Sequence, residues 1–236
     1  MAVVYVLLNQ KGGVGKSTVA VNLAAVTAEV TGADLGPDDP SPVAAVSIDP
    51  QGSAVWWGSR VDNLPFHVVQ AHSDLDQLKR LRELPGIDTV VVDTPGWLDV
   101  TDQDDDRDPL GEGPAGDALR AVLECADMVV VPITTEPLSF DPTARTIHKV
   151  IKPRGLPYRV VLNAWDPRDG EAERDETLEF IRRQNWLGTK TVIRRYKVHT
   201  RASLNGQVVT EYASSGTALR AREDFYKLAL ELRAGV

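Results

Sequence analysis

The sequence predicts a three-layer α/β fold, in which helices cover both faces of a mainly parallel, doubly wound sheet. One observation is a series of short apolar runs. Most of them are β-branched and apolar at both odd and even positions, which is typical of strands buried on both faces. Another is that stretches of helical periodicity separate these runs, as crossovers between parallel strands require. The strands are expected at residues 3–8, 43–48, 89–92, 128–133, 159–162 and 191–193.

The helices between these strands are expected at about residues 16–30, 73–84, 115–125, 140–151, 171–184 and 216–234. Residues 32–42 are rich in Gly, Pro and Asp and indicate a loop. Residues 99–117 carry eight acidic side chains against Arg107 alone, which indicates a solvated, flexible insert or, alternatively, an acidic docking surface for a basic partner. No repeat or linker divides the chain, so residues 1–236 are predicted to form a single domain.

Composition excludes several classes of protein. No apolar run approaches the ~20 residues of a membrane span, and the first residues lack the basic segment of a signal peptide. Cys125 is the only cysteine, which excludes an internal disulfide and a cysteine-rich metal or iron–sulfur site. The four histidines show no ligand spacing. These features predict a cytoplasmic protein.

The net charge of −8 conceals an asymmetry along the chain. Residues 1–144 carry 8 basic and 23 acidic side chains, a net charge of −15, whereas residues 145–236 carry 18 and 11, a net charge of +7. Within residues 182–222 there are nine Lys or Arg side chains and one acid, Glu211. A globally acidic protein with such a basic zone can still bind a polyanion locally.

A glycine-rich turn follows the first strand, where residues 9–18 read Asn-Gln-Lys-Gly-Gly-Val-Gly-Lys-Ser-Thr. Glycines let the backbone turn tightly and aim several N–H groups at one point, and the helix that follows adds partial positive charge. Lys16 is placed to reach terminal phosphates, and the Ser17 hydroxyl suits a magnesium ion. The residues predicted to bind a nucleotide are Lys11, Gly12, Gly13, Val14, Gly15, Lys16, Ser17 and Thr18.

Two features of this turn depart from the usual phosphate loop. Gln10 occupies the position of the first glycine, and Lys11 precedes the remaining glycines. A second lysine has no evident role if one phosphate chain is bound within one subunit. Its position is explained if Lys11 reaches a nucleotide held by a partner across a dimer interface.

Two further strands end in acidic residues, and ligands sit at the carboxyl ends of strands in α/β sheets. Residues 47–53 read Ser-Ile-Asp-Pro-Gln-Gly-Ser, and residues 93–96 read Asp-Thr-Pro-Gly. An aspartate after a hydrophobic strand holds magnesium in many nucleotide sites, although alone it also suits a turn. Together with the glycine-rich loop, Asp93 is predicted to be a metal ligand.

Residues 11–17 resemble the deviant Walker A motif of the ParA/MinD ATPases, residues 49–52 resemble the switch I of that family, and residues 93–96 resemble its switch II. The resemblance implies a P-loop NTPase fold, ATP and Mg²⁺ as ligands, and an ATP-sandwiched homodimer in which Lys11 crosses to the partner's nucleotide. It also implies that Asp49 positions the attacking water and touches the magnesium shell. The catalytic residues are therefore expected to be Lys11, Lys16 and Asp49, and the metal residues Ser17, Asp49 and Asp93. Ser47 replaces the first aspartate of the family's switch I, a change that bears on magnesium affinity and hydrolysis rate.

A GTP-binding alternative rests on residues 163–166, Asn-Ala-Trp-Asp, which resemble the guanine-reading Asn-Lys-x-Asp motif. Residues 93–96 also fit the Asp-x-x-Gly of GTPases. Against this alternative, Ala164 replaces the lysine that stacks on guanine, and Lys11 has no place in that scheme. In the ParA group this strand end lies beside the adenine, so the resemblance implies that Asn163 contacts the nucleotide.

A basic cluster with an aromatic residue inside it occupies residues 194–201, and two more arginines begin the last helix. ParA relatives use basic residues in this region to bind DNA nonspecifically, whereas the alternative is a solvated charged surface. The expected DNA-binding residues are Arg194, Arg195, Lys197, Arg201, Arg220 and Arg222. The last helix also carries acids, unlike the lysine-rich amphipathic tail by which MinD holds membranes, so no membrane partner is expected.

The resemblance covers nearly the whole chain, and the first strand begins at residue 3 without a helix-turn-helix extension, which points to the small ParA type. The main hypothesis is a nucleoid-associated partition ATPase for plasmid or chromosome DNA. Its ATP dimer binds DNA without sequence preference, and a ParB-like centromere-binding protein stimulates its slow hydrolysis. The alternative is a MinD-like or carboxysome-type positioning ATPase that acts on a protein or membrane cargo. An electron-transfer protein of the nitrogenase-iron-protein kind is excluded because it needs cluster cysteines.

Overall fold

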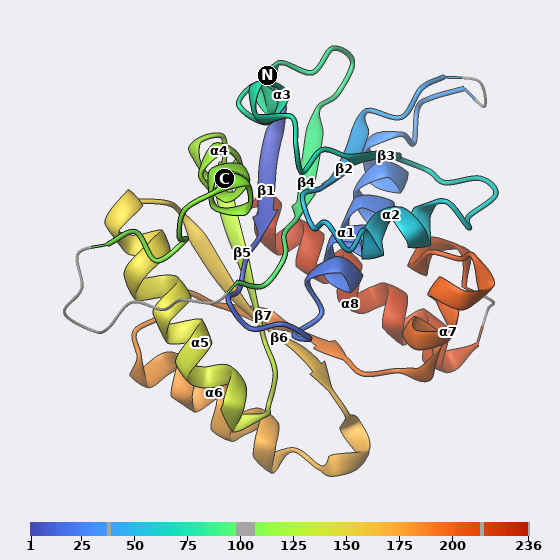
Figure 1. The fold of residues 1–236 in the computed structure, drawn as a ribbon. Coiled ribbons are helices and arrows are strands. Elements are labelled where there is room, and N and C mark those ends of the chain that lie inside the picture. Colours follow the sequence, from blue (N-terminus) through green and yellow to red (C-terminus); the bar gives the residue numbers. More distant parts are fainter. Residues whose placement is uncertain (37–38, 98–106, 213–214, 236) are drawn as a thin grey trace.

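Parallel strands form one sheet at the centre of the protein, in the order β3-β2-β4-β1-β5-β6-β7 (Figure 1). The computed structural model describes residues 1–36, 39–97, 107–212 and 215–235. Every strand pair in this described part is parallel. The strands are β1 (Val3–Leu7), β2 (Val43–Ser47), β3 (His67–Gln70), β4 (Thr89–Asp93), β5 (Met128–Ile133), β6 (Tyr158–Trp165) and β7 (Gly188–Arg194).

Helices cover both faces of this sheet (Figure 1). One face carries α1 (Lys16–Thr31), α2 (Ser53–Gly58), α7 (Lys197–Asn205) and α8 (Gly216–Arg233). The other carries α3 (Leu75–Leu78), α4 (Pro114–Glu124), α5 (Phe140–Arg145) and α6 (Ala172–Arg183). The α5 helix continues as a π-helical segment, Thr146–Ile151. The predicted three-layer, doubly wound α/β fold is thus confirmed.

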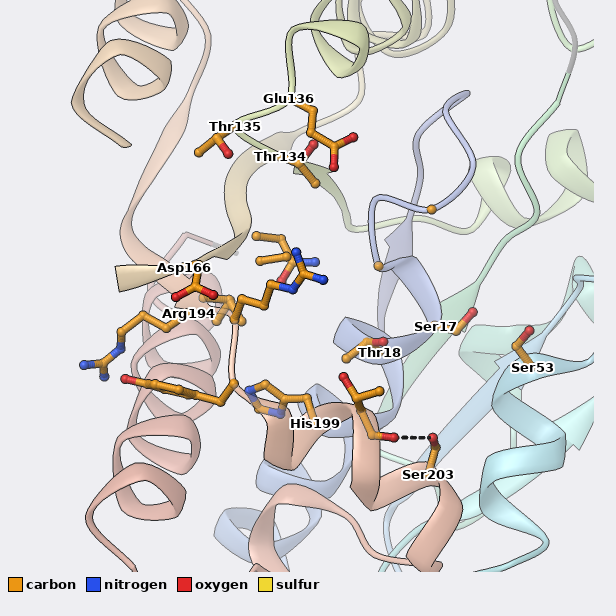
Figure 2. Close-up of a pocket in the computed structure, with 18 of the residues that line it drawn as sticks. Ser17, Thr18, Ser53, Thr134, Thr135, Glu136, Asp166, Arg194, His199 and Ser203 are labelled. Carbon is orange, nitrogen blue, oxygen red and sulfur yellow. Dashed lines mark hydrogen bonds between the residues drawn. The ribbon is translucent and has the colours of Figure 1, made fainter. Parts of the chain in front are cut away.

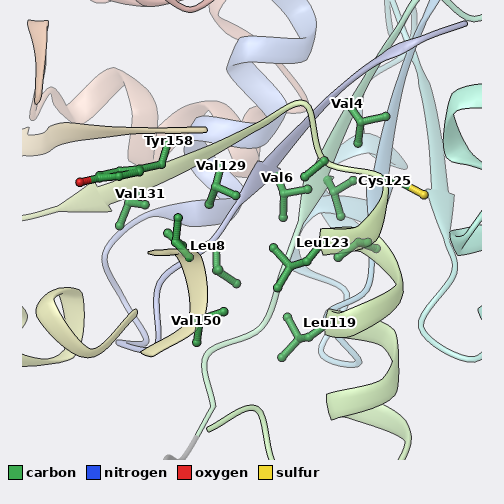
Figure 3. Packing of buried hydrophobic residues seen from close by; sticks show 14 of the residues in the cluster. Val4, Val6, Leu8, Leu119, Leu123, Cys125, Val129, Val131, Val150 and Tyr158 are labelled. Carbon is green, nitrogen blue, oxygen red and sulfur yellow. The ribbon is translucent and has the colours of Figure 1, made fainter. Parts of the chain in front are cut away.

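Alternate residues of the central strands enter two separate cores. Val4 and Val6 of β1 belong to the core on one face, together with Leu119 and Leu123 of α4 (Figure 3). Tyr5 and Leu7 point into the other core, against α1 and α8. Because both faces are covered, both positions of the strand repeat must be apolar, which explains the continuous apolar runs in the sequence.

Three short elements escaped prediction, and one predicted helix is wrong as a continuous element. β3, α2 and α7 are each too short or too polar to show a clear period. The helix expected at residues 73–84 is instead the single turn α3 followed by a 3₁₀ turn, Leu81–Glu83. The Cys125 thiol donates to the carbonyl oxygens of Leu78 and Lys79, at 3.4 and 3.1 Å, where the helix breaks.

The expected acidic insert coincides only partly with the described residues. Residues 99–106 lie outside them, and residues 114–117 form the first turn of α4. Between these parts, the Asp108 carboxylate forms ion pairs with Arg120, at 2.9 Å, and Arg154, at 3.1 Å. The carboxyl-terminal part of this stretch is therefore fixed to α4 and to the turn before β6. Among the described residues, no helix has the length and apolarity that a membrane span needs.

Candidate nucleotide-binding site

The loop between β1 and α1 encloses the Lys16 side chain, of which only 7% is exposed. Its ammonium donates hydrogen bonds to the carbonyl oxygens of Asn9, at 3.0 Å, and Lys11, at 3.1 Å. Burial lowers the pKa of Lys16 to about 8. A bound anion favours the charged form of a lysine, so this loop suits a phosphate group.

A close approach between the loop and β6 explains one of the glycines. The Asn163 side-chain amide donates to the Val14 carbonyl oxygen at 2.8 Å, and a Cβ on Gly15 would lie 2.2 Å from the same amide nitrogen. Gly15 also has a φ of +87°, which a residue with a side chain rarely adopts. Asn163 therefore lies against the phosphate loop, although it is 149 residues from Val14 in the sequence.

Buried acceptors without partners lie at the carboxyl ends of β4 and β2. Asp93 is 0% exposed, and neither of its carboxylate oxygens has a hydrogen-bond partner within the described residues. Ser47 is in register with Asp93 on the neighbouring strand, and its buried hydroxyl also lacks a described partner. Burial raises the pKa of Asp93 to about 7. A cation beside Asp93 and the nearby Ser17 hydroxyl would satisfy these oxygens, so the residues present fit the expected Mg²⁺.

Asp49 lies just beyond β2 and is held by its neighbours. Its carboxylate accepts the Gln51 backbone N–H at 2.9 Å, and its carbonyl oxygen accepts the Gln70 side-chain amide at 2.8 Å. Sequence reasoning missed Gln70 because it lies at the end of β3, a strand that was not predicted. Two β-branched residues before Gln70, Val68 and Val69, were the available signal.

A cavity of about 810 Å³ opens beside the phosphate loop. Figure 2 shows Ser17 and Thr18 from the start of α1, the loop after β5 with Glu136, and His199 from α7 around this space. Asn163 also lines it. Lys11 does not line the cavity, and its ammonium has no hydrogen bond or ion pair within the described part of the chain.

The expected DNA-binding residues divide into two groups. Arg194 forms an ion pair with the buried Asp224 at 2.6 Å and lies over the Tyr196 ring. Arg222 pairs with Glu29 and donates to the Tyr226 hydroxyl at 3.2 Å. These two guanidinium groups are held by intramolecular contacts. The remaining four residues are exposed and form what we call the α7 patch: Arg195, Lys197, Arg201 and Arg220.

The structure changes the extent of the basic zone expected at residues 182–222. Arg182 and Arg183 belong to α6, on the opposite face of the sheet from α7, and both pair with Glu179. Arg60, in the turn after α2, lies beside α7 instead, where it donates to the Leu204 carbonyl oxygen at 3.4 Å and covers the Trp56 ring. The position of Arg60 beside α7 could not be predicted from the sequence, because Arg60 lies 144 residues from Leu204.

His199 connects α7 to the core below it. Its Nδ1 lies 3.1 Å from the Tyr212 hydroxyl, its ring meets Phe225 edge-on, and its Nε2 is buried without a partner in the described structure. Burial lowers the pKa of His199 to about 4. The folded state therefore resists protonation of this histidine.

This histidine predicts a loss of stability in mild acid. Below the unfolded-state pKa of about 6.5, the unfolded chain binds a proton that the folded protein does not, so acidification favours unfolding until the pH reaches about 4. Between pH 7 and pH 5 we expect His199 to account for a loss of about 2 kcal/mol in the free energy of unfolding. Urea unfolding at both pH values should show this difference in the wild type and in His67→Gln, an exposed-histidine control. His199→Gln should largely abolish it, and an unchanged pH dependence in that variant would contradict the assignment.

The chain matches a family model described as the CobQ/CobB/MinD/ParA nucleotide binding domain over residues 5–209. It is 36% identical over 231 residues to "Maintenance of carboxysome distribution protein A" of Gloeobacter kilaueensis, covering 97% of this chain and 93% of the relative. It is 28% identical over 252 residues to "Chromosome-partitioning ATPase Soj" of Thermus thermophilus, covering 98% and 95%. The solved structure of a Cyanothece McdA(D38A)-ATP complex has the same fold, with a TM-score of 0.68 at 15% identity and coverage of 97% and 96%.

Proposed function

The chain belongs to the CobQ/CobB/MinD/ParA family of nucleotide-binding proteins, and from this premise we propose that it is an ATP-driven positioning protein whose cargo is a large protein assembly. The supporting observation is the 36% identity to a carboxysome distribution protein over 97% of the chain. This identity favours the positioning of a protein cargo, the alternative drawn from the sequence, over the partition of DNA.

Nucleotide binding is assigned to the loop and the strand ends around it. The backbone N–H groups of residues 12–18 and the Lys16 ammonium bind the phosphates, while Asn163 fixes the loop against β6. Ser17, Asp49 and Asp93 would hold Mg²⁺, which would supply positive charge to neutralise the phosphates. Burial of Asp93 keeps this carboxylate away from bulk water and available for the cation.

Hydrolysis is assigned to Asp49 and to a second subunit. Asp49 is half-buried and is fixed by Gln51 and Gln70, so its carboxylate is placed to orient an attacking water. The Lys11 ammonium has no hydrogen bond or ion pair within the described part of its own subunit, which supports a role at the nucleotide of a homodimer partner. A site that is complete only in the dimer hydrolyses slowly until a partner protein stabilises the active arrangement.

Asp49→Ala should separate ATP binding from hydrolysis. The variant loses the group that orients water but retains the phosphate loop, so we expect its ATP affinity to stay within about threefold and its hydrolysis rate to fall by at least about a hundredfold. The ATP-bound dimer should persist as a result. Asp62→Ala, which removes an exposed acid elsewhere, is the matched control in a phosphate-release assay. Full turnover by Asp49→Ala would move the catalytic role to another residue.

The surface that carries the protein on DNA is assigned to the α7 patch. Lys197 and Arg201 are four residues apart on α7 and therefore share one face of the helix. A single patch contacts few phosphates, whereas a dimer presents two patches on one rigid body and raises the effective concentration of the second. DNA binding, and with it a nucleoid location, follows from ATP-dependent dimerisation.

Removing charge from the α7 patch should weaken DNA binding on every sequence. For Lys197→Ala/Arg201→Ala we expect a shallower dependence of log affinity on log salt, because each lost phosphate contact removes about 0.9 from the slope. Arg182→Ala/Arg183→Ala removes the same charge from α6, on the opposite face of the sheet, and should bind DNA like the wild type. Fluorescence anisotropy on two unrelated duplexes provides the measurement. Equal losses in both double variants would argue for a general charge effect instead of a specific surface.

A second candidate function is DNA partition with a ParB-like partner, which the 28% identity to Soj supports. The two functions differ in the cargo, so deletion of the gene in its own organism distinguishes them. If the cargo is a protein assembly, the assemblies should cluster while plasmids and chromosomes are inherited normally. Loss of DNA with normally spaced assemblies would contradict the main proposal and support partition.

A further inference from the structure

The start of the phosphate loop, Asn9 to Lys11, is fastened to α5 and to the π-helical segment that continues it. The Asn9 side-chain amide donates to the Thr143 hydroxyl at 2.8 Å and to the Pro132 carbonyl oxygen at 2.8 Å. The Gln10 backbone N–H donates to the Thr146 hydroxyl at 3.0 Å. The side-chain oxygen of Asn9, Oδ1, accepts a hydrogen bond from the Lys11 backbone N–H at 2.9 Å. This network ties the backbone at Lys11 to two threonines.

The two threonines have the same hydrogen-bonding pattern. The Thr143 hydroxyl donates its proton to the Ser139 carbonyl oxygen at 2.7 Å, and the Thr146 hydroxyl donates to the Pro142 carbonyl oxygen at 2.8 Å. Each hydroxyl has only one proton, so towards the loop it acts as an acceptor. Asn9, Thr143 and Thr146 are all 0% exposed, and water is therefore not available to replace a lost bond.

The helix departs from regular geometry where these hydroxyls face the loop. Thr146 is the first residue of the π-helical segment Thr146–Ile151. Hydroxyls that bond back to the preceding turn bend helices, and π-helical turns occur often at functional sites. The same element is linked to the nucleotide cavity, because the Ser139 hydroxyl donates at 3.0 Å to the carbonyl oxygen of Thr134, a cavity residue.

We propose that Thr143 and Thr146 are positioning residues for Lys11, acting through Asn9 and the Gln10 backbone. They fix the backbone turn that carries Lys11, so that its ammonium is presented to a nucleotide in a second copy of the chain. The inference rests on the proposed role of Lys11 across a dimer interface. The inference adds a role for α5, which begins where the loop after β5 ends: this helix controls the position of Lys11.

Valine has nearly the shape of threonine but accepts no hydrogen bond, so Thr143→Val/Thr146→Val tests the network directly. We expect the protein concentration for half-maximal ATP-dependent dimerisation to rise by at least about tenfold, because buried donors of the Lys11 turn lose their acceptors. The Kd for ATP of the monomer should stay within about threefold, since the Lys16 side chain and residues 12–18 are untouched. Light scattering against protein concentration and binding of a fluorescent ATP analogue give the two values.

Two sets of variants separate positioning from a structural role. Thr143→Ser/Thr146→Ser keeps both hydroxyls and should dimerise like the wild type. Thr177→Val is the control for a lost buried hydroxyl. The Thr177 hydroxyl is equally buried and donates to the Glu173 carbonyl oxygen at 2.8 Å, but Thr177 lies on α6 and does not bond to the loop. This variant should also dimerise normally. If the double valine variant does not fold, the single Thr146→Val, which loses one bond to the loop, decides the question.

Normal dimerisation of a folded valine variant would overturn the inference, as would a loss of ATP affinity that equals the loss of dimerisation. Failure of the serine variant to restore dimerisation would also contradict it. The wild type and Lys11→Ala belong in the same series. A wild type that does not dimerise with ATP, or a Lys11→Ala variant that does, would instead refute the proposed function and remove the basis of the inference.

Discussion

Lys16→Ala is expected to lower the affinity for ATP by at least about a hundredfold, because hydrogen bonds to charged groups are worth about 1.5–3 kcal/mol each and this ammonium would face several phosphate oxygens of a bound nucleotide. The side chain lies inside the loop, where its ammonium bonds to the Asn9 and Lys11 carbonyl oxygens. Titration calorimetry with ATP and Mg²⁺ measures the loss.

The control for this substitution is Lys79→Ala, which removes an exposed lysine from the far end of α3 and should bind ATP like the wild type. Thermal unfolding of both variants checks that the fold survives. Unchanged ATP affinity in a folded Lys16→Ala variant would show that this loop is not the ATP site, and would contradict every step that depends on ATP.

Lys11→Ala is expected to abolish the ATP-dependent dimer while ATP affinity of the monomer stays within about threefold. The Lys11 ammonium has no described partner in its own subunit, so its removal breaks no side-chain contact of the local site. Across an interface it would lie against phosphate charge away from water, where one such pair contributes about 1.5–3 kcal/mol or more, and two symmetric pairs form per dimer.

Light scattering should therefore show a mass that rises from 25.7 kDa to twice that value in the wild type with ATP, and no rise for Lys11→Ala. Hydrolysis should fall with the dimer. Lys79→Ala is again the matched control. A normal ATP-dependent dimer in Lys11→Ala would show that the nucleotides are not shared across the interface.

The nucleotide loop and Asp93 were predictable because their chemistry depends on local order. Seven consecutive residues fix the geometry of the loop, and an aspartate directly after a buried strand must lie at the carboxyl edge of the sheet. The strand runs themselves were recognisable because both faces of the sheet are covered. Such features need no knowledge of distant contacts.

The supports of the site were not predictable from the sequence. Thr146 meets Gln10 across 136 residues, and Gln70 reaches Asp49 from a strand of four residues that has no strong period. Proximity in the sequence also did not show which arginines belong to the exposed basic surface. Arg194 belongs to the basic run but pairs with Asp224, 30 residues later, whereas Arg60 contacts α7 from the turn after α2.

We propose that ATP assembles two positive patches into one surface that binds DNA. Fluorescence anisotropy of the wild type on duplex DNA, with ATP, with ADP and without nucleotide, tests this claim most directly. We expect binding with ATP alone, equal affinity for unrelated sequences, and a linear decrease of log affinity with log salt whose slope is about −0.9 per phosphate contact. Equal binding in all three nucleotide states, or no salt-sensitive binding to DNA with ATP, would contradict it.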